Sequence, residues 1–177
     1  MPRRDGECRW ARPVAPEKRH LQNRYGTAER AGRFYDDQVL DHVNPAMIDF
    51  LGRQELAFVA TADATGECDN SLRAGAPGFL HVIDSTTLAY PEYRGNGVMA
   101  SLGNILENPH VGIMVVDFVD DLIGLHVNGS ARIVEDEELC SHIPNLPADG
   151  GKGRTPISGC SSTSMRPTST AASTFPG

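Results

Sequence analysis

The sequence predicts a mainly β fold with flanking helices, in the form of a small β-barrel. Strand-length stretches of apolar or alternating residues recur between residues 55 and 136. Short segments rich in Gly, Asn and Asp separate these stretches, as tight turns require. Helical periodicity is found once before them and once among them. Because 177 residues can bury one core of ordinary size, we expect a single barrel domain with attached helices.

The first helix of the barrel region is predicted at "NPAMIDFLGRQ", residues 44–54. Asn44 can cap its first turn, and Pro45 suits the first helical position. Met47, Ile48 and Leu51 share one face of such a helix. The segment therefore begins with a start signal and presents an apolar side to the barrel.

The stretches that follow predict five or six strands. Gly75, Pro77 and Gly78 interrupt the second stretch, which therefore forms either one bulged strand or two short strands. The alternation of the last stretch is typical of a half-buried antiparallel strand. The predicted strands lie within residues 55–63, 68–84, 86–91, 110–118 and 122–136.

A second helix is predicted over residues 97–107, within "YPEYRGNGVMASLGNILENPH". Asn96 is a candidate N-cap, and "ENP" ends the helix. Four apolar residues form one stripe at helical spacing. They are Met99, Leu102, Ile105 and Leu106.

The turn in front of this helix is a candidate anion site. A helix N-terminus offers unpaired N–H groups and partial positive charge. Gly95 and Gly97 let the backbone approach a ligand closely, and Arg94 stands beside them. These features suit a phosphate. A connection whose glycines only satisfy turn geometry is the alternative.

Ser71 and Arg73 form a second candidate site, where the predicted strand gives way to Gly-rich chain. Residues two apart on a strand point to the same face, so both side chains can reach one ligand. The alternative is a surface hydroxyl beside a surface Arg that is paired with one of many carboxylates.

Basic and acidic residues are unevenly distributed along the chain. Residues 1–33 hold nine Lys or Arg against four Asp or Glu, whereas residues 34–140 hold eighteen Asp or Glu against four Arg and no Lys. The acidic region argues against nucleic acid as a partner. We expect residues 1–33 to be a flexible basic arm, although RNA or lipid contacts are an alternative.

Other features predict a soluble cytoplasmic protein. No apolar stretch is long enough for a membrane span, and the N-terminus lacks the apolar core of a secretory signal. The four cysteines are widely separated and form no C-x-x-C pair, which argues against a zinc site or a disulfide framework.

Three segments, taken in order, resemble the pyridoxamine 5′-phosphate oxidase-like family of FMN-binding split β-barrels. They are "LAFVATADATGECDNSLRAGAPGFLHVID", "TLAYPEYRGNGVMASLGNILENPHVGIMVVDF" and "LHVNGSARIVED". The resemblance covers about residues 34–138 and implies a homodimer with FMN at the subunit interface. It implies that the cofactor contacts are Arg73, Arg94, Ser71, Tyr90, Asn96, Ser101 and Asn104.

One departure from the family pattern concerns the phosphate. Many relatives carry basic residues just after the "GN" of the turn, where this chain has Gly97 and Val98. The anion must then rely on Arg73, Arg94, backbone amides or an Arg from the partner subunit. Related barrels bind the deazaflavin F420 or haem, which are the less favoured cofactors. For haem, His81 or His126 would be the candidate axial ligands.

The final segment, residues 141–177, changes composition. From about residue 150 it is rich in Ser, Thr, Pro and Gly, which predicts a disordered tail. Read one base out of frame, "CSSTSMRPTSTAASTFPG" permits "FVDVDEAYIHCSKHIPR", which alternates like a strand and resembles the family's final strand. We therefore predict that a single-base change near residues 140–155 put the tail out of frame and removed the closing strand.

These observations favour a flavin-binding protein, and within that class an FMN-dependent oxidoreductase acting on an unidentified small molecule. No side chain stands out as a general base, so the cofactor would carry the chemistry. A flavin- or deazaflavin-binding module without turnover is one alternative. A truncated product that has lost activity is the other.

Overall fold

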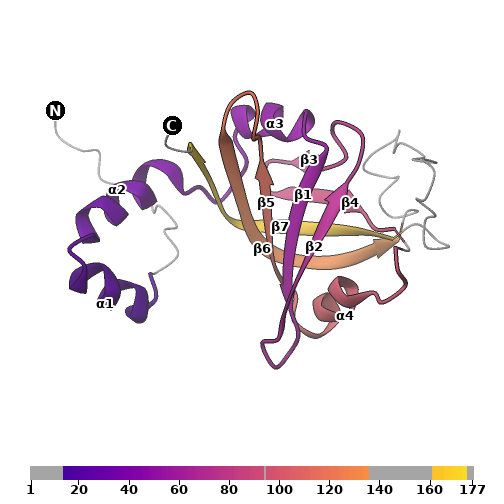
Figure 1. Ribbon diagram of the computed structural model, residues 1–177, viewed down its shortest axis with the longest axis horizontal. Coiled ribbons are helices and arrows are strands. Elements are labelled where there is room, and N and C mark those ends of the chain that lie inside the picture. Colours follow the sequence, from indigo (N-terminus) through magenta and orange to yellow (C-terminus); the bar gives the residue numbers. More distant parts are fainter. Residues whose placement is uncertain (1–13, 94, 136–160, 175–177) are drawn as a thin grey trace.

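The computed structural model describes residues 14–93, 95–135 and 161–174, and its elements are shown in Figure 1. Four helices and seven strands occur in these residues. The helices are α1 (Pro16–Arg24), α2 (Ala28–Gln38), α3 (Pro45–Gly52) and α4 (Ala100–Glu107). The strands are β1 (Leu56–Ala62), β2 (Cys68–Ala74), β3 (His81–Asp84), β4 (Thr87–Pro91), β5 (His110–Val116), β6 (Ile123–Glu135) and β7 (Ser161–Thr174).

All seven strands belong to one antiparallel sheet with the order β2-β1-β5-β6-β7-β4-β3. The sheet curls into a barrel, with α3 and α4 at opposite ends in the view of Figure 1. Strands β2 and β3 are its two edges and do not pair with each other, so the barrel is split rather than closed. The mainly β fold with flanking helices is thereby confirmed.

The strands form where β-formers alternate, and the alternation sets which side chains are buried. In β1 the burial pattern alternates strictly, with Ala57 and Val59 inside and Leu56 and Phe58 outside. The buried core draws on β1, β4, β5 and β6 and on α3 and α4, and the partly buried Val82 of β3 packs against it. Its fully buried members include Leu51, Val59, Leu88, Tyr90, Leu125 and Val127.

Helix α3 begins as the sequence predicts. The Asn44 side chain accepts a hydrogen bond from the Met47 N–H at 2.9 Å, and Pro45 occupies the first helical position. Met47 and Leu51 are buried, but Ile48 is 36% exposed and Phe50 takes its place in the core. Two of the three residues predicted for the apolar face therefore pack, and Phe50 packs in place of Ile48.

The two ends of the described chain contain more secondary structure than the sequence indicates. Helices α1 and α2 lie within or next to the segment expected to be a flexible arm, although no residue of either helix is buried. Strand β7 lies within the segment expected to be a disordered tail. The last strand of the sheet, which the sequence predicts to be missing, is thus present. The backbone of residues 161–174 pairs with β6 along its whole length and with β4 over residues 162–165. The frame-shift itself stays a prediction about the gene.

Among the described residues, no helix combines the length and the apolar character needed to cross a membrane.

Candidate functional site at the β2–α4 groove

Strand β2 and the start of α4 meet through a short hydroxyl chain. The Ser101 hydroxyl donates to the Asp69 carboxylate at 3.3 Å, and the Ser71 and Ser101 hydroxyl oxygens lie 2.9 Å apart. Because Ser101 uses its proton toward Asp69, Ser71 is the donor to Ser101. Ser101 is buried, with 4% of its surface exposed. These bonds fix the helix start against the edge strand.

Arg73 lies on the same strand, two residues from Ser71, and its guanidinium is mostly buried. One terminal nitrogen donates to a Glu92 carboxylate oxygen at 3.0 Å, and the other donates to the Leu72 carbonyl at 3.4 Å. The side chains of Arg73 and Glu92 are 15% and 4% exposed. The guanidinium carbon lies 6.0 Å from the centre of the Tyr90 ring. The Arg73 Nε is buried and has no hydrogen-bond partner among the described residues.

The backbone conformation of the Gly-rich turn, and the residue at which the following helix begins, differ from the prediction. Every second residue of this turn adopts left-handed backbone: φ is +50° at Gly95, +80° at Gly97 and +57° at Met99. Helix α4 consequently begins at Ala100 rather than at residue 97. Asn96 does not cap it. Its side-chain oxygen accepts from the Val98 N–H at 3.0 Å, within the turn.

The N-terminus of α4 has no side-chain cap, because Met99 occupies that position. The first helical residues, Ala100 to Leu102, border a groove of about 450 Å³ between the turn and β2. Its size is in the range of small-molecule sites, roughly 300–1,000 Å³. The lining residues are Asp69, Asn70, Ser71, Leu72, Arg73, Ala74, Glu92, Tyr93, Gly95, Asn96, Val98, Met99, Ala100, Ser101 and Leu102.

The structure brings four of the seven predicted site residues to this groove: Ser71, Arg73, Asn96 and Ser101. Tyr90 is fully buried, with its ring beside the Arg73 guanidinium. Asn104 lies one turn further along α4, where its amide donates to the Thr61 hydroxyl at 3.0 Å. Its side chain thus ties α4 to β1. Arg94 lies outside the described residues.

Two carboxylates at the groove, Asp69 and Glu92, are absent from the sequence-based prediction. Glu92 is 5% exposed and forms the buried ion pair with Arg73. The alternative raised for Arg73, a pairing with one of many carboxylates, is therefore what the structure contains, although the pair is buried. A signal in the sequence could have indicated Glu92, because this acidic residue directly follows the strongly apolar strand β4. Among the described lining residues, Arg73 is the one Lys or Arg.

The two histidines considered for haem lie elsewhere. His81 is on β3 and His126 on β6, and neither lines the groove. Burial lowers the pKa of His81 from its ordinary value. No cluster of His, Cys, Asp or Glu suited to a metal ion occurs in the part of the chain that the structure describes.

Comparison with known proteins assigns the family. Residues 43–146, more than half of the chain, match the family described as Pyridoxamine 5′-phosphate oxidase. The chain belongs to this family, as its sequence resemblance and its split barrel indicate. None of the curated proteins matches the chain.

Solved structures share the fold at low identity. HupZ from Group A Streptococcus has a TM-score of 0.53 and 22% identity, over 74% of this chain and 99% of that one. An F420 reductase has a TM-score of 0.50 and 22% identity, over 73% and 98%. HutZ, the heme storage protein of Vibrio cholerae, has a TM-score of 0.51 and 20% identity, over 70% and 89%. Proteins named for different cofactors thus share this fold.

Proposed function

We propose that this protein binds FMN in the β2–α4 groove and acts as an FMN-dependent oxidoreductase on a small molecule. The observation that carries the proposal is the groove itself. It joins Ser71 and Arg73 of an edge strand to an uncapped helix N-terminus and a turn whose glycines leave the backbone accessible. Family membership supports a flavin as the ligand.

The residues present fit FMN in their donor chemistry. The backbone amides that begin α4 can donate to hydroxyl or phosphate oxygens, and the Ser71 oxygen can accept from a ligand hydroxyl. The Arg73 Nε is a buried donor with no partner among the described residues, and a ligand oxygen could satisfy it. Bound FMN would supply hydride or electron transfer, while these residues would bind and orient it.

Glu92 affects how strongly the groove can bind an anionic ligand. Because its carboxylate already neutralises Arg73, an anionic ligand gains less from that guanidinium than from an unpaired one. We infer that Glu92 lowers the affinity of the groove for phosphate, and that ligand binding competes with the ion pair. The effect is testable, because Glu92→Gln keeps the shape of the side chain and removes its charge.

An apolar row on the outer face of the sheet supports a homodimer with the cofactor at the subunit interface. Leu72, Phe58 and Met114 are cross-strand neighbours on β2, β1 and β5, and they are 55%, 39% and 37% exposed. A second copy covering this row would remove apolar surface from water. Leu72 also lines the groove, so such an interface would border the cofactor.

F420 is the alternative cofactor, supported by the F420 reductase that shares the fold. Haem has weaker support, because neither His81 nor His126 lines the groove. A flavin- or deazaflavin-binding module without turnover, or a product that has lost activity through an out-of-frame tail, are the alternatives to an enzyme. The widely separated cysteines support a cytoplasmic location.

The test is a titration of the purified protein with FMN, F420 and haem, followed by absorption spectra. We expect FMN to bind, and Arg73→Met to weaken it at least tenfold. Arg53→Met is the matched control, because Arg53 forms an exposed pair with Asp121 outside the groove. Glu92→Gln should tighten FMN binding several-fold. Bleaching of the bound flavin by NADH or NADPH would distinguish an enzyme from a non-catalytic module.

Two results would contradict the proposal. One is wild-type protein that shows no protein-bound flavin absorption after saturation with FMN and removal of the free cofactor. The other is an equal effect of Arg73→Met and Arg53→Met on FMN affinity, since that would show the groove arginine to be unimportant.

A further inference from the structure

One face of the edge strand β2 is polar and contacts α4. Asp69, Ser71 and Arg73 alternate along this strand with more exposed residues, and all three line the β2–α4 groove. The side chains of Asp69 and Ser71 both bond to Ser101 of α4, which is 4% exposed. Asp69, Ser101 and Ser71 thus form one continuous chain of hydrogen bonds, which we call the Asp69 relay.

The carboxylate sets the direction of the hydrogen bonds in this relay. A carboxylate can only accept, so the Ser101 hydroxyl donates its proton to Asp69 across 3.3 Å. Ser101 then has only lone pairs left for Ser71, whose oxygen lies 2.9 Å away. Ser71 therefore donates to Ser101. The reverse direction would place the lone pairs of the Ser101 oxygen against the carboxylate.

Ser71 consequently presents lone pairs to the groove. Its proton is used toward Ser101, and its oxygen receives no side-chain hydrogen bond from any other residue in the described part of the chain. A ligand hydroxyl can donate to this oxygen, whereas a phosphate oxygen needs a donor and would meet lone pairs. The Asp69 carboxylate also repels an anion nearby. Hydrogen-bond direction and charge therefore both favour a neutral hydroxyl at this position.

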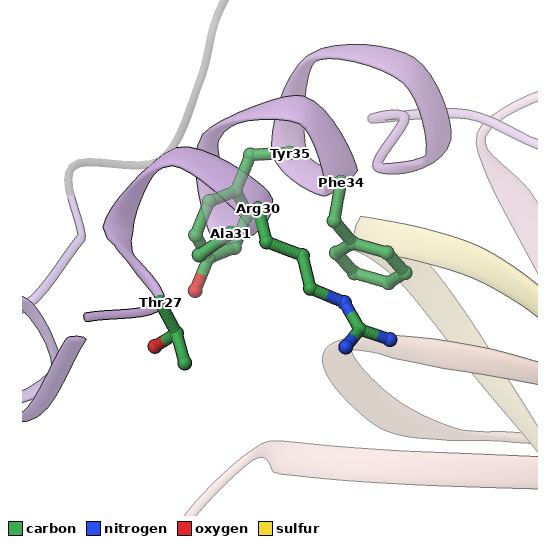
Figure 2. Close-up of a pocket in the computed structure, with 5 residues that line it drawn as sticks. All are labelled: Thr27, Arg30, Ala31, Phe34 and Tyr35. Atoms are coloured by element: carbon green, nitrogen blue, oxygen red, sulfur yellow. The ribbon is translucent and has the colours of Figure 1, made fainter. Parts of the chain in front are cut away.

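A second hollow, on α2, has no such buried network. Figure 2 shows the five residues that line its volume of about 350 Å³: Thr27, Arg30, Ala31, Phe34 and Tyr35. No residue of α2 is buried, and Thr27 makes no side-chain cap hydrogen bond. An exposed hydroxyl such as that of Thr27 can rotate to suit donors and acceptors alike. Selectivity by hydrogen-bond direction is therefore expected in the β2–α4 groove, where the middle residue of the relay is buried.

We propose that Asp69 sets the ligand specificity of the groove by fixing the direction of the Asp69 relay. Ser71 accepts a hydrogen bond from a hydroxyl of the bound molecule, so the β2 side of the groove selects polyol groups over phosphate. Asp69 acts through Ser101 and Ser71 and is therefore a positioning residue. The inference rests on the proposed function, because FMN carries both ribityl hydroxyls and a phosphate, and it assigns a hydroxyl to Ser71.

Asp69→Asn tests the inference, because it keeps the shape of the side chain and allows the relay to reverse. The new amide can donate to Ser101, so that Ser101 donates to Ser71 and Ser71 to the ligand. Riboflavin and lumiflavin are the probes. Both are uncharged, so the loss of negative charge at position 69 affects them alike, but lumiflavin lacks the ribityl hydroxyls. Fluorescence titration gives the dissociation constants for wild type, Asp69→Asn, Ser71→Ala and the double variant.

We expect Asp69→Asn and Ser71→Ala each to reduce the preference for riboflavin over lumiflavin about fivefold to tenfold, as the loss of one hydrogen bond predicts. Added to Ser71→Ala, Asp69→Asn should change the preference no further, because the relay then no longer reaches the ligand. Asp49→Asn is the matched control, since Asp49 lies exposed on α3 and does not line the groove. It should leave the preference unchanged. Circular dichroism verifies folding for each variant.

Two results would overturn the inference. One is an unchanged riboflavin preference in Asp69→Asn. The other is an effect of Asp69→Asn that is equally large with and without Ser71→Ala, because Asp69 would then act without the relay.

A titration with ribitol keeps the inference apart from the proposed function. Ribitol carries the hydroxyls without the flavin ring, and the backbone amide NMR signals of residues 69–73 report its binding. If no flavin binds but ribitol shifts these signals in wild type and not in Asp69→Asn, the function fails and the inference stands. If flavins bind and the riboflavin preference does not depend on Asp69, the inference fails and the function stands. If neither flavins nor ribitol bind, both fail.

Discussion

The barrel and the two N-terminal helices use their side chains in opposite ways. The barrel packs apolar residues from α3, α4 and most of its strands into one core and buries the Arg73–Glu92 ion pair. Helices α1 and α2 bury no residue, and the Arg33–Glu29 pair of α2 is exposed. Burial, rather than residue type, therefore decides what each contact contributes to stability. Matched substitutions in the two regions test this, with protein concentration held constant.

The largest difference is expected for leucines. Leu88 is fully buried in β4, so Leu88→Ala removes apolar contacts and leaves a cavity. We expect its free energy of unfolding to fall by about 3 kcal/mol. Leu21 in α1 is 48% exposed, and Leu21→Ala should cost less than about 0.5 kcal/mol. Urea denaturation followed by circular dichroism measures both, and equal losses would contradict the contrast.

The ion pairs come next. Glu92→Gln leaves the mostly buried Arg73 guanidinium without its counter-charge, which should cost about 2 kcal/mol, less than for a fully buried pair because Arg73 keeps some solvent contact. Glu29→Gln in α2 breaks a pair whose side chains are 64% and 89% exposed. Such pairs contribute about 0–1 kcal/mol. If Glu92→Gln were neutral by the same denaturation assay, the ion pair would be unimportant to the fold.

Helix caps should differ more modestly. The Asn44 side chain caps α3 through the Met47 N–H, so Asn44→Ala should cost about 1 kcal/mol. Thr27 occupies the same position before α2 but makes no side-chain cap hydrogen bond. We expect Thr27→Ala to stay within about 0.3 kcal/mol of wild type, because no cap hydrogen bond is lost. A cost for Thr27→Ala as large as that for Asn44→Ala would show that the cap is not the cause.

The strands were predictable because their signals are local. Alternation places β1 within residues 55–63. The interruption at Gly75, Pro77 and Gly78 falls between β2 and β3, so the second of the two predicted alternatives, two short strands, is the one found. The cap at Asn44 was predictable for the same reason. Side-chain period and turn chemistry act over a few residues and can be read from one sequence.

The start of α4 was not predictable, because its conformation runs against residue preference. Met99 adopts φ +57°, which L side chains rarely do, and this delays the helix past Asn96. The packed face also differs. Ser101 and Ile105 are buried, whereas Leu106 is 77% exposed, because the Ser101 hydroxyl bonds to β2 and turns that side of α4 toward the sheet.

The pairing partner of Arg73 was equally hidden from the sequence. Glu92 is 19 residues away, and the two meet only because β2 and the end of β4 lie at the same side of the barrel. Among eighteen acidic residues, spacing alone could not select this one. The charge of the N-terminal segment predicts a flexible arm and carries no sign of a helix, whereas α2 has an amphipathic pattern.

The smallest expected effect concerns pH. Burial lowers the pKa of His81, half-buried in β3, below its ordinary value of about 6.5. Below that pH the unfolded chain binds a proton that the folded chain does not, so the free energy of unfolding should fall as pH drops from about 6.5. Asp63 and Asp117 have a pKa lowered by hydrogen bonds to their carboxylates, but they act only at more acidic pH.

His81→Phe should therefore flatten the fall in stability between about pH 6.5 and pH 5, measured by urea denaturation at several pH values. His20→Phe is the matched control, because His20 lies exposed on α1. An unchanged slope in His81→Phe, or an equal flattening in both variants, would show that the burial of His81 is not what links folding to protons. Because the barrel partly shields the His81 imidazole from water, this prediction extends the contrast between the two regions from packing to ionisation.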